Sequence, residues 1–427
     1  MKRRDFFRIT LPSVTLPMLL NGFSMQAFAE SPLAGLIEAG EENDRVLVLV
    51  QLNGGNDGLN TIIPIDVYDR YYAARTNIAI PKEKILTLQG VDHTGLNPAM
   101  THIQQLYGEG KISIVQAVSY PKPNFSHFRA TDIWLTGADS DQVLESGWAG
   151  RYLDESYPGF PADYPSNKMA DPLAIQIGGI VSPALQGPLT TMGMAISNPT
   201  SFYELLKSEP VAQSPSRAGD QLAYIRQMSM KTDQYAGVIK QAALKVKQQS
   251  DKYPAAGKNP LADQLKIVAR LIAGGLKTKV YMVSMGGFDT HSKQTEQSDT
   301  TAGNHARLLG RLSEAIGAFM EDINGLGVGD RVLGMTFSEF GRRIKSNASG
   351  GTDHGAGAPV ILFGNKVKPG VMGTSPDIPE QASVKDNVGM QHDFRALYAG
   401  ILRNWFQKEP AETRLVLYKD FQPLNIV

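Results

Sequence analysis

The chain has 427 residues, 42 basic and 42 acidic side chains, and no cysteine. The lack of cysteine excludes a disulfide framework, a cysteine-ligated zinc site and a cysteine nucleophile. A balanced charge argues against nucleic-acid binding, which normally needs a basic surface. No apolar run beyond the N-terminal segment is long enough to cross a bilayer, so we expect no stable membrane span and no nucleic-acid partner.

The N-terminus carries the features of an export signal. Residues 2–8 are Lys-Arg-Arg-Asp-Phe-Phe-Arg, a twin-arginine pattern, and an interrupted apolar stretch follows as far as Phe28. Ala27-Phe28-Ala29 is a small-x-small pattern, so we expect cleavage after Ala29. A retained amphipathic helix is the alternative. The sequence therefore predicts a signal peptide over 1–29, contact with the twin-arginine translocase during export, and a periplasmic domain over 30–427.

Continuous apolar runs are predicted to form strands that are covered on both faces, as in a parallel sheet. The runs span 46–52, 112–118, 279–285, 332–337 and 359–363. Apolar residues from Leu308 to Ile323 recur at helical spacing, which predicts a crossover helix between the third and fourth runs. This order of strand, polar loop, helix and strand predicts a doubly wound, mostly parallel α/β sheet.

The middle of the chain has a different composition. Residues 156–217 are rich in proline, glycine and serine, so we expect little regular structure there, whereas 218–276 is predicted to be mostly helical. We interpret 156–276 as an insertion on the sheet and not as an independent domain. A closing helix is expected over 394–406.

Side chains that can bind a metal are concentrated at the ends of the predicted strands. They are Asp57, Asp289, His291, Glu339, Asp353 and His354. In open α/β sheets, ligands bind beyond the carboxyl ends of the strands. Carboxylate and imidazole groups suit zinc, manganese, magnesium or calcium. Considered alone, Asp57 is typical of a turn residue, and Asp289 of a helix N-cap followed by a surface histidine.

Ser126 is the candidate nucleophile because it precedes a predicted helix that starts at His127. A hydroxyl at a helix N-terminus lies near free N–H groups that suit an anionic ester, although a plain N-cap serine is the alternative. His127 is left as a proton donor, a metal ligand or an outward-facing residue. The candidate substrate contacts are Asn56, Asn124 and Arg342, and the arginine could instead form salt bridges.

Five motifs together resemble one protein family. They are Leu-Asn-Gly-Gly-Asn-Asp-Gly-Leu-Asn (52–60), Asn-Phe-Ser-His-Phe-Arg (124–129), Gly-Gly-Phe-Asp-Thr-His (286–291), Phe-Ser-Glu-Phe-Gly-Arg-Arg (337–343) and Gly-Thr-Asp-His-Gly (351–355). Over roughly 45–410, the chain resembles a family of exported bacterial proteins that is filed as a domain of unknown function. That family is assigned to the alkaline phosphatase and sulfatase superfamily.

The resemblance implies a metal-dependent hydrolase of phosphate or sulfate esters. It implies that Asp57, Asp289 and His291 bind metal and that Ser126 is the nucleophile. The superfamily usually has Asp-His-Gly where this chain has Glu339-Phe340-Gly341, so a phenylalanine replaces one ligand and the number of metals, one or two, stays open.

The last histidine ligand of the pattern can be aligned in two ways. Either His354 is that ligand, with Asp353 beside it, or this pair takes the Asp-His-Gly place and His392 comes last.

The predicted substrate is an anionic small molecule or an envelope ester, and the predicted cofactor is zinc, manganese or calcium. The alternatives are a non-catalytic periplasmic binding or assembly protein with a structural metal, and an envelope phospho-group transferase.

Overall fold

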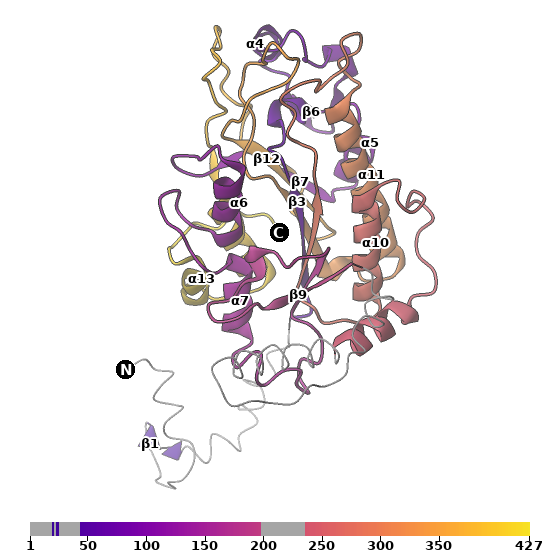
Figure 1. Ribbon diagram of the computed structural model, residues 1–427, viewed down its shortest axis with the longest axis vertical. Helices are drawn as coiled ribbons and strands as arrows, with labels where there is room; N and C mark the ends of the chain where they lie inside the picture. The colour runs from indigo at the N-terminus through magenta and orange to yellow at the C-terminus, as the bar shows by residue number, and fades with distance from the viewer. Residues whose placement is uncertain (1–18, 21–22, 25–42, 198–234) are drawn as a thin grey trace, which may run out of the picture. The chain divides into compact units, whose positions relative to one another are not determined.

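A nine-stranded sheet forms the centre of the unit that spans Arg45–Val427 (Figure 1). Its strands lie in the order β13-β7-β12-β11-β3-β10-β8-β9, and β14 pairs with β7. The bounds are β3 Val46–Leu52, β7 Ile112–Ser119, β8 Ala174–Ile177, β9 Gly193–Ile196, β10 Val280–Met285, β11 Val332–Phe337, β12 Ala358–Phe363, β13 Gly370–Met372 and β14 His392–Asp393.

The sheet is mixed but mostly parallel, which confirms the predicted α/β class. Within the described part of the chain, β12 is the strand that runs against its neighbours β7 and β11, and the other pairs are parallel. This reversal has a consequence for the site. Residues that precede β12 lie at the edge where the parallel strands have their carboxyl ends, so the Gly-Thr-Asp-His-Gly loop meets the loops that follow β3, β10 and β11.

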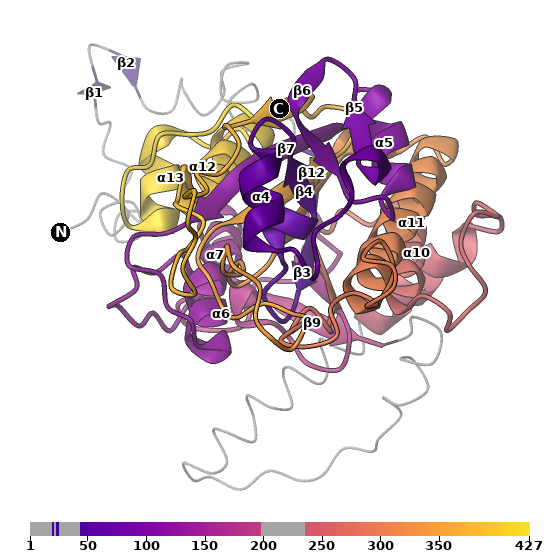
Figure 2. The ribbon, with the colours of Figure 1, turned by 90° about the horizontal axis from the view of Figure 1, so that it is seen from above.

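Helices cover both faces of the sheet (Figures 1 and 2). One face carries α5 Thr101–Gly108, α10 Pro260–Ala273 and α11 Asn304–Gly325, and the other carries α6 His127–Thr136, α7 Trp148–Ser156, α12 Phe394–Gly400 and α13 Pro410–Leu417. The alternation along β3 explains this arrangement, because Val46, Val48 and Val50 pack into one core and Leu47 and Leu49 into the other. α11 is the predicted crossover helix.

Smaller elements surround the sheet. They are α4 Tyr68–Ala74, a three-stranded sheet of β4 Ile62–Pro64, β5 Leu86–Leu88 and β6 Val91–Leu96, short 3₁₀ segments at 58–60, 82–84, 183–185 and 329–331, and a π-helical segment over Ile401–Trp405. The last continues α12, so the closing helix predicted over 394–406 is present with a change of helical type.

The stretch predicted to have little regular structure, 156–217, contains two short strands that the sequence pattern does not predict. Residues 174–177 and 193–196 form β8 and β9 and extend the central sheet beyond β10. Each strand has only four residues, so its apolar pattern is too short to stand out in a stretch rich in turn-forming residues. Residues 198–217 of the predicted irregular stretch, and 218–234 of the predicted helical one, lie outside the described residues.

The computed structural model describes residues 19–20, 23–24, 43–197 and 235–427. Met1–Asp44 is a separate unit in which β1 (Leu19–Leu20) pairs antiparallel with β2 (Phe23–Ser24). The rest of the predicted signal peptide lies outside the described residues. None of the described helices combines the length and the hydropathy that a membrane span requires.

Candidate metal centre

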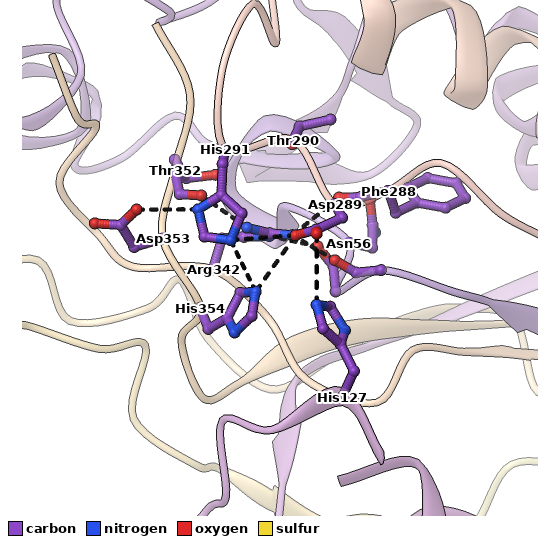
Figure 3. A network of polar contacts seen from close by, with 12 residues as sticks. Asn56, His127, Phe288, Asp289, Thr290, His291, Arg342, Thr352, Asp353 and His354 are labelled. Carbon is purple, nitrogen blue, oxygen red and sulfur yellow. Dashed lines mark hydrogen bonds and ion pairs between the residues drawn. The ribbon is translucent and has the colours of Figure 1, made fainter. Parts of the chain in front are cut away.

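Three histidines and an aspartate from three segments meet beyond the carboxyl ends of the strands (Figure 3). His127 opens α6 after β7, Asp289 and His291 follow β10, and His354 precedes β12. Ligand atoms of His127, Asp289 and His354 lie within 4.8 Å of one another. Nε2 of His291 is 2.9 Å from Nε2 of His354 and 3.2 Å from Oδ1 of Asp289. The sequence predicted three of these residues as ligands and left His127 open.

The Nδ1 atom of each histidine is held by an oxygen. His354 Nδ1 donates to the carbonyl oxygen of Phe125 at 2.8 Å, which fixes the tautomer because a carbonyl only accepts. The other two are held by carboxylates: His127 Nδ1 lies 2.8 Å from Glu339 Oε1, and His291 Nδ1 lies 3.1 Å from Asp353 Oδ1.

This pattern leaves Nε2 of each histidine as the atom that faces Asp289. The distances from the Asp289 carboxylate are 3.6 Å for His127, 3.2 Å for His291 and 3.3 Å for His354. Metal-binding histidines typically hold one ring nitrogen on an oxygen acceptor and bind the ion with the other. The donor set and its outer partners therefore fit a divalent metal.

Glu339 and Asp353, which were predicted as ligands, contact the histidines instead. Glu339 is 3% exposed, and its Oε1 also accepts the N–H of Gly54 at 2.8 Å. Asp353 is held by Asn347 Nδ2 at 3.2 Å as well as by His291. Both carboxylates thus orient imidazole rings, and the candidate ligand atoms come mainly from histidine.

Arg342 has a different role from the predicted anion contact. Its side chain is fully buried, and its guanidinium donates to the carbonyl oxygens of Gly54, Gly55, Phe288 and Thr352. It also donates to Asp289 Oδ1 at 2.6 Å. Burial raises the pKa of Asp289, but the hydrogen bond and charge of Arg342 outweigh it and hold that pKa below its usual range. Arg342 therefore joins three loops and keeps Asp289 ionised.

Two glycines allow these loops to approach one another closely. Gly54 has a φ of +122°, and a Cβ there would lie 2.3 Å from the backbone nitrogen of Asp289. A Cβ on Gly351 would lie 2.4 Å from the carbonyl carbon of His291. Side chains at these positions would push apart the segments that carry the candidate ligands.

Phe340 closes the inner side of the centre. Its ring centroid lies 4.9 Å from that of His127 and 4.5 Å from that of His354, and the residue is 2% exposed. An apolar ring thus occupies the position where the resemblance calls for a ligand. The ring offers no donor atom to a metal ion.

Ser126 lies between two residues that contact the centre, Phe125 through its carbonyl and His127 through its ring. It is exposed and is the N-cap of α6, but its hydroxyl makes no capping hydrogen bond. Its backbone N–H instead donates to Asn124 Oδ1 at 2.9 Å. Asn124 therefore shapes the turn before α6, and the Ser126 hydroxyl is accessible.

Asp57 lies in a second, buried cluster and not among the candidate ligands. Both of its oxygens accept from Arg75 Nη1, at 2.6 and 2.8 Å, and Oδ2 also accepts from Gln294 Nε2 at 2.5 Å. Burial raises the pKa of Asp57, yet the charge of Arg75 and the hydrogen bonds from Arg75 and Gln294 hold it below the usual range. Asn56, predicted to contact substrate, is 2% exposed and accepts from His305 Nε2 at 3.0 Å.

Gln294 connects the two clusters. Its Oε1 accepts from Thr290 Oγ1 and from Thr352 Oγ1, each at 3.0 Å, while its Nε2 binds Asp57. Thr290 lies between Asp289 and His291, and Thr352 precedes Asp353. The buried cluster thereby fixes the two loops that supply most of the candidate ligands.

His392 is not part of either cluster. It pairs with Val118 in the main sheet, its Nε2 has no hydrogen-bond partner, and burial lowers its pKa.

The sequence did not reveal Arg75, Gln294 and His305 as partners of the site. A signal existed for His305, because it precedes Leu309 and Leu312 by four and seven residues and so shares the buried stripe of α11.

Several solved structures are similar to this chain. The sulfatase PsFucS1 from a Pseudoalteromonas species is 11% identical, with 79% of this chain and 66% of that chain covered and a TM-score of 0.33. A putative sulfatase, yidJ from Bacteroides fragilis, is 10% identical, with 90% and 80% covered and a TM-score of 0.37. The alkaline phosphatase from the Antarctic bacterium TAB5 is 10% identical, with 76% and 92% covered and a TM-score of 0.30.

The family of the chain follows from its sequence. No curated protein matches it. Residues 116–404 match the family described as "Protein of unknown function (DUF1501)", and they contain four of the five motifs. Because this match covers more than half of the chain, the protein belongs to the DUF1501 family.

Proposed function

We propose that this protein is a metal-dependent hydrolase of phosphate or sulfate esters that uses one divalent ion. The observation that carries the proposal is the shared pattern of His127, His291 and His354. Each holds Nδ1 on an oxygen and directs Nε2 toward Asp289. One ion is proposed because Asp57 is neutralised by Arg75 and because Phe340 brings no donor atom.

Zinc suits this donor set best. Imidazole nitrogens with one carboxylate are typical zinc ligands, whereas calcium prefers a shell of oxygens. When bound, the ion would polarise the ester and neutralise the charge that develops on its oxygens. Arg342 supports this role by holding the Asp289 carboxylate ionised and in place.

Ser126 is the proposed nucleophile. Its oxygen would form a bond to the phosphorus or sulfur atom as the bond to the ester oxygen breaks in line with it. The hydroxyl proton would pass to solvent, which the exposure of Ser126 permits, and the departing alcohol would take up a proton. Water would then hydrolyse the seryl ester and restore Ser126. The free N–H groups of the first turn of α6 would favour the anionic group.

The proposed location is the periplasm. It rests on the twin-arginine pattern of residues 2–8 and on the cleavage pattern at Ala27-Phe28-Ala29. The substrate would then be an anionic ester in the envelope or one that enters the periplasm.

Metal content and turnover test this proposal together. We expect one equivalent of zinc in the purified protein by elemental analysis, and its loss in His354→Ala and in Asp289→Ala. His93→Ala is the matched control, since His93 lies in β6 outside the candidate group, and it should keep the metal. Ser126→Ala should keep the metal and lose turnover of phosphate and sulfate esters.

Two outcomes would contradict the proposal. A wild-type protein that takes up no divalent ion even after reconstitution would remove the hydrolytic mechanism. A metal-loaded protein that turns over no ester, with the metal raising only the melting temperature, would favour a binding protein with a structural ion. Retained turnover in Ser126→Ala would overturn the nucleophile alone.

A further inference from the structure

A cleft of about 490 Å³ opens directly beside the candidate metal centre. His127 and Glu339 line it together with Gly54, so the cleft and the centre share walls. Its volume lies within the roughly 300–1,000 Å³ of small-molecule pockets. A group bonded to an ester at the metal centre would therefore have this cleft as its neighbouring space.

One face of α6 forms a wall of the cleft. Phe128, Thr131, Asp132 and Leu135 line it, and their spacing of three, four and seven residues puts them on the same side of the helix. The opposite side, which includes Ile133 and Trp134, packs in the core. Phe128 is 91% exposed, so its ring is not required for packing and is available to a bound molecule.

The remaining walls are poor in charge that could attract an anion. Pro183 and Asn53 complete the lining, and none of the described lining residues is lysine or arginine. The two lining carboxylates already have partners, since Asp132 pairs with Arg129 and Glu339 with His127. A nucleotide or a multiply sulfated glycan would find no lysine or arginine among the described lining residues, whereas an apolar group would cover Phe128.

We propose that this cleft binds the alcohol part of the ester and selects uncharged, apolar alcohols, with Phe128 as the specificity-determining residue. The proposal rests on the proposed function, because it places the reacting ester at the metal centre. It predicts that the preferred substrates are phosphate or sulfate monoesters of alkyl or aryl alcohols and not esters of polyanions.

Normal alkyl esters test the proposal cleanly, because their alcohols differ in length and hardly in acidity. For the metal-loaded protein we expect kcat/KM to rise about tenfold from the ethyl to the octyl ester, roughly 1.4 kcal/mol. Phe128→Ala should lower kcat/KM for the octyl ester about tenfold and for the ethyl ester less than twofold. Val143→Ala is the control, because Val143 is 78% exposed and does not line the cleft.

A binding measurement separates this inference from the proposed function. The dissociation constant of 2-naphthol, followed by its fluorescence, should rise at least fivefold in Phe128→Ala and stay unchanged in Val143→Ala. Naphthol binding that depends on Phe128, without turnover of any ester, would overturn the hydrolase and support the apolar cleft. Ester turnover with no dependence on chain length, and naphthol binding unchanged in Phe128→Ala, would overturn the cleft and leave the hydrolase standing.

Discussion

Two neighbouring clusters of this protein contain aspartate, arginine and histidine but place them in opposite surroundings. In the candidate metal centre, the side chains of His127, Asp289 and His291 are 35%, 48% and 45% exposed. In the buried cluster, Asp57, Arg75 and His305 are at most 1% exposed.

The two clusters differ in whether the protein itself supplies hydrogen-bond partners for their polar atoms. In the buried cluster, Asp57 accepts from Arg75 and Gln294, and His305 donates to Asn56, so the protein supplies the partners itself. In the open cluster, Nε2 atoms face one another and a carboxylate, an arrangement that a bound cation would complete. We therefore assign stability and positioning to the buried cluster, and the open cluster is the part of the molecule to which the proposed metal binding belongs.

Removal of Arg75 is expected to have the largest effect on stability. Arg75→Met leaves the Asp57 carboxylate buried without its charge partner and frees the carbonyl oxygens of Arg343 and Ile344. Breaking a buried pair in this way typically costs about 3–5 kcal/mol. The unfolding free energy in urea should fall by that amount in metal-free protein.

Arg70→Met is the matched control, because Arg70 lies in α4 and Arg75 is the C-cap of the same helix. Arg70 pairs with Glu380 at 3.6 Å on the surface, where the side chains are 44% and 84% exposed. Loss of such a pair should cost less than about 1 kcal/mol. If the two variants lower the unfolding free energy equally, the buried cluster does not have the stabilising role that separates it from the open cluster.

The open cluster was largely visible in the sequence, whereas the buried one was not. Asp289, His291 and His354 could be predicted because they flank apolar runs, and the ends of such strands gather at one edge of a sheet. His127 remained ambiguous, since its role depends on the register between the start of α6 and the loop of Asp289.

The buried cluster escaped prediction for a physical reason. Arginine is rarely fully buried, and Arg75 ends a short helix in a polar stretch, so nothing in the pattern marks it as the partner of Asp57. The pair forms only through a tertiary contact across 18 residues. In the same way, the strands of the main sheet were predicted from long apolar runs, and the four-residue strands β8 and β9 were not.

The pH dependence of stability should reveal the buried histidine. Burial lowers the pKa of His305 to about 4, below its ordinary value of 6.5. Between these two values the unfolded chain binds a proton that the folded protein does not, so stability is lost as the pH falls from 6.5 toward 4. The contribution is on the order of 3 kcal/mol.

Urea titrations of metal-free protein at pH 7 and pH 4.5 measure this loss. His305→Gln keeps a side-chain N–H donor for Asn56 and cannot titrate, so its decrease between the two pH values should be smaller than that of the wild type. An equal decrease in both proteins would mean that His305 is not held neutral by burial.

The smallest effect on stability is expected at Asp353. Its carboxylate acts on the open cluster through His291. Asp353→Asn keeps an oxygen that accepts from Nδ1 but removes the charge that strengthens the ring as a ligand. Metal affinity, measured by competition with a chelating dye, should fall about 10–100-fold, as is typical for outer partners of metal-binding histidines. The unfolding free energy of the metal-free protein should change by less than about 0.5 kcal/mol, because Asp353 is 57% exposed. If neither Asp353→Asn nor His291→Ala weakens zinc binding, His291 is not a ligand, and the centre reduces to His127, Asp289 and His354.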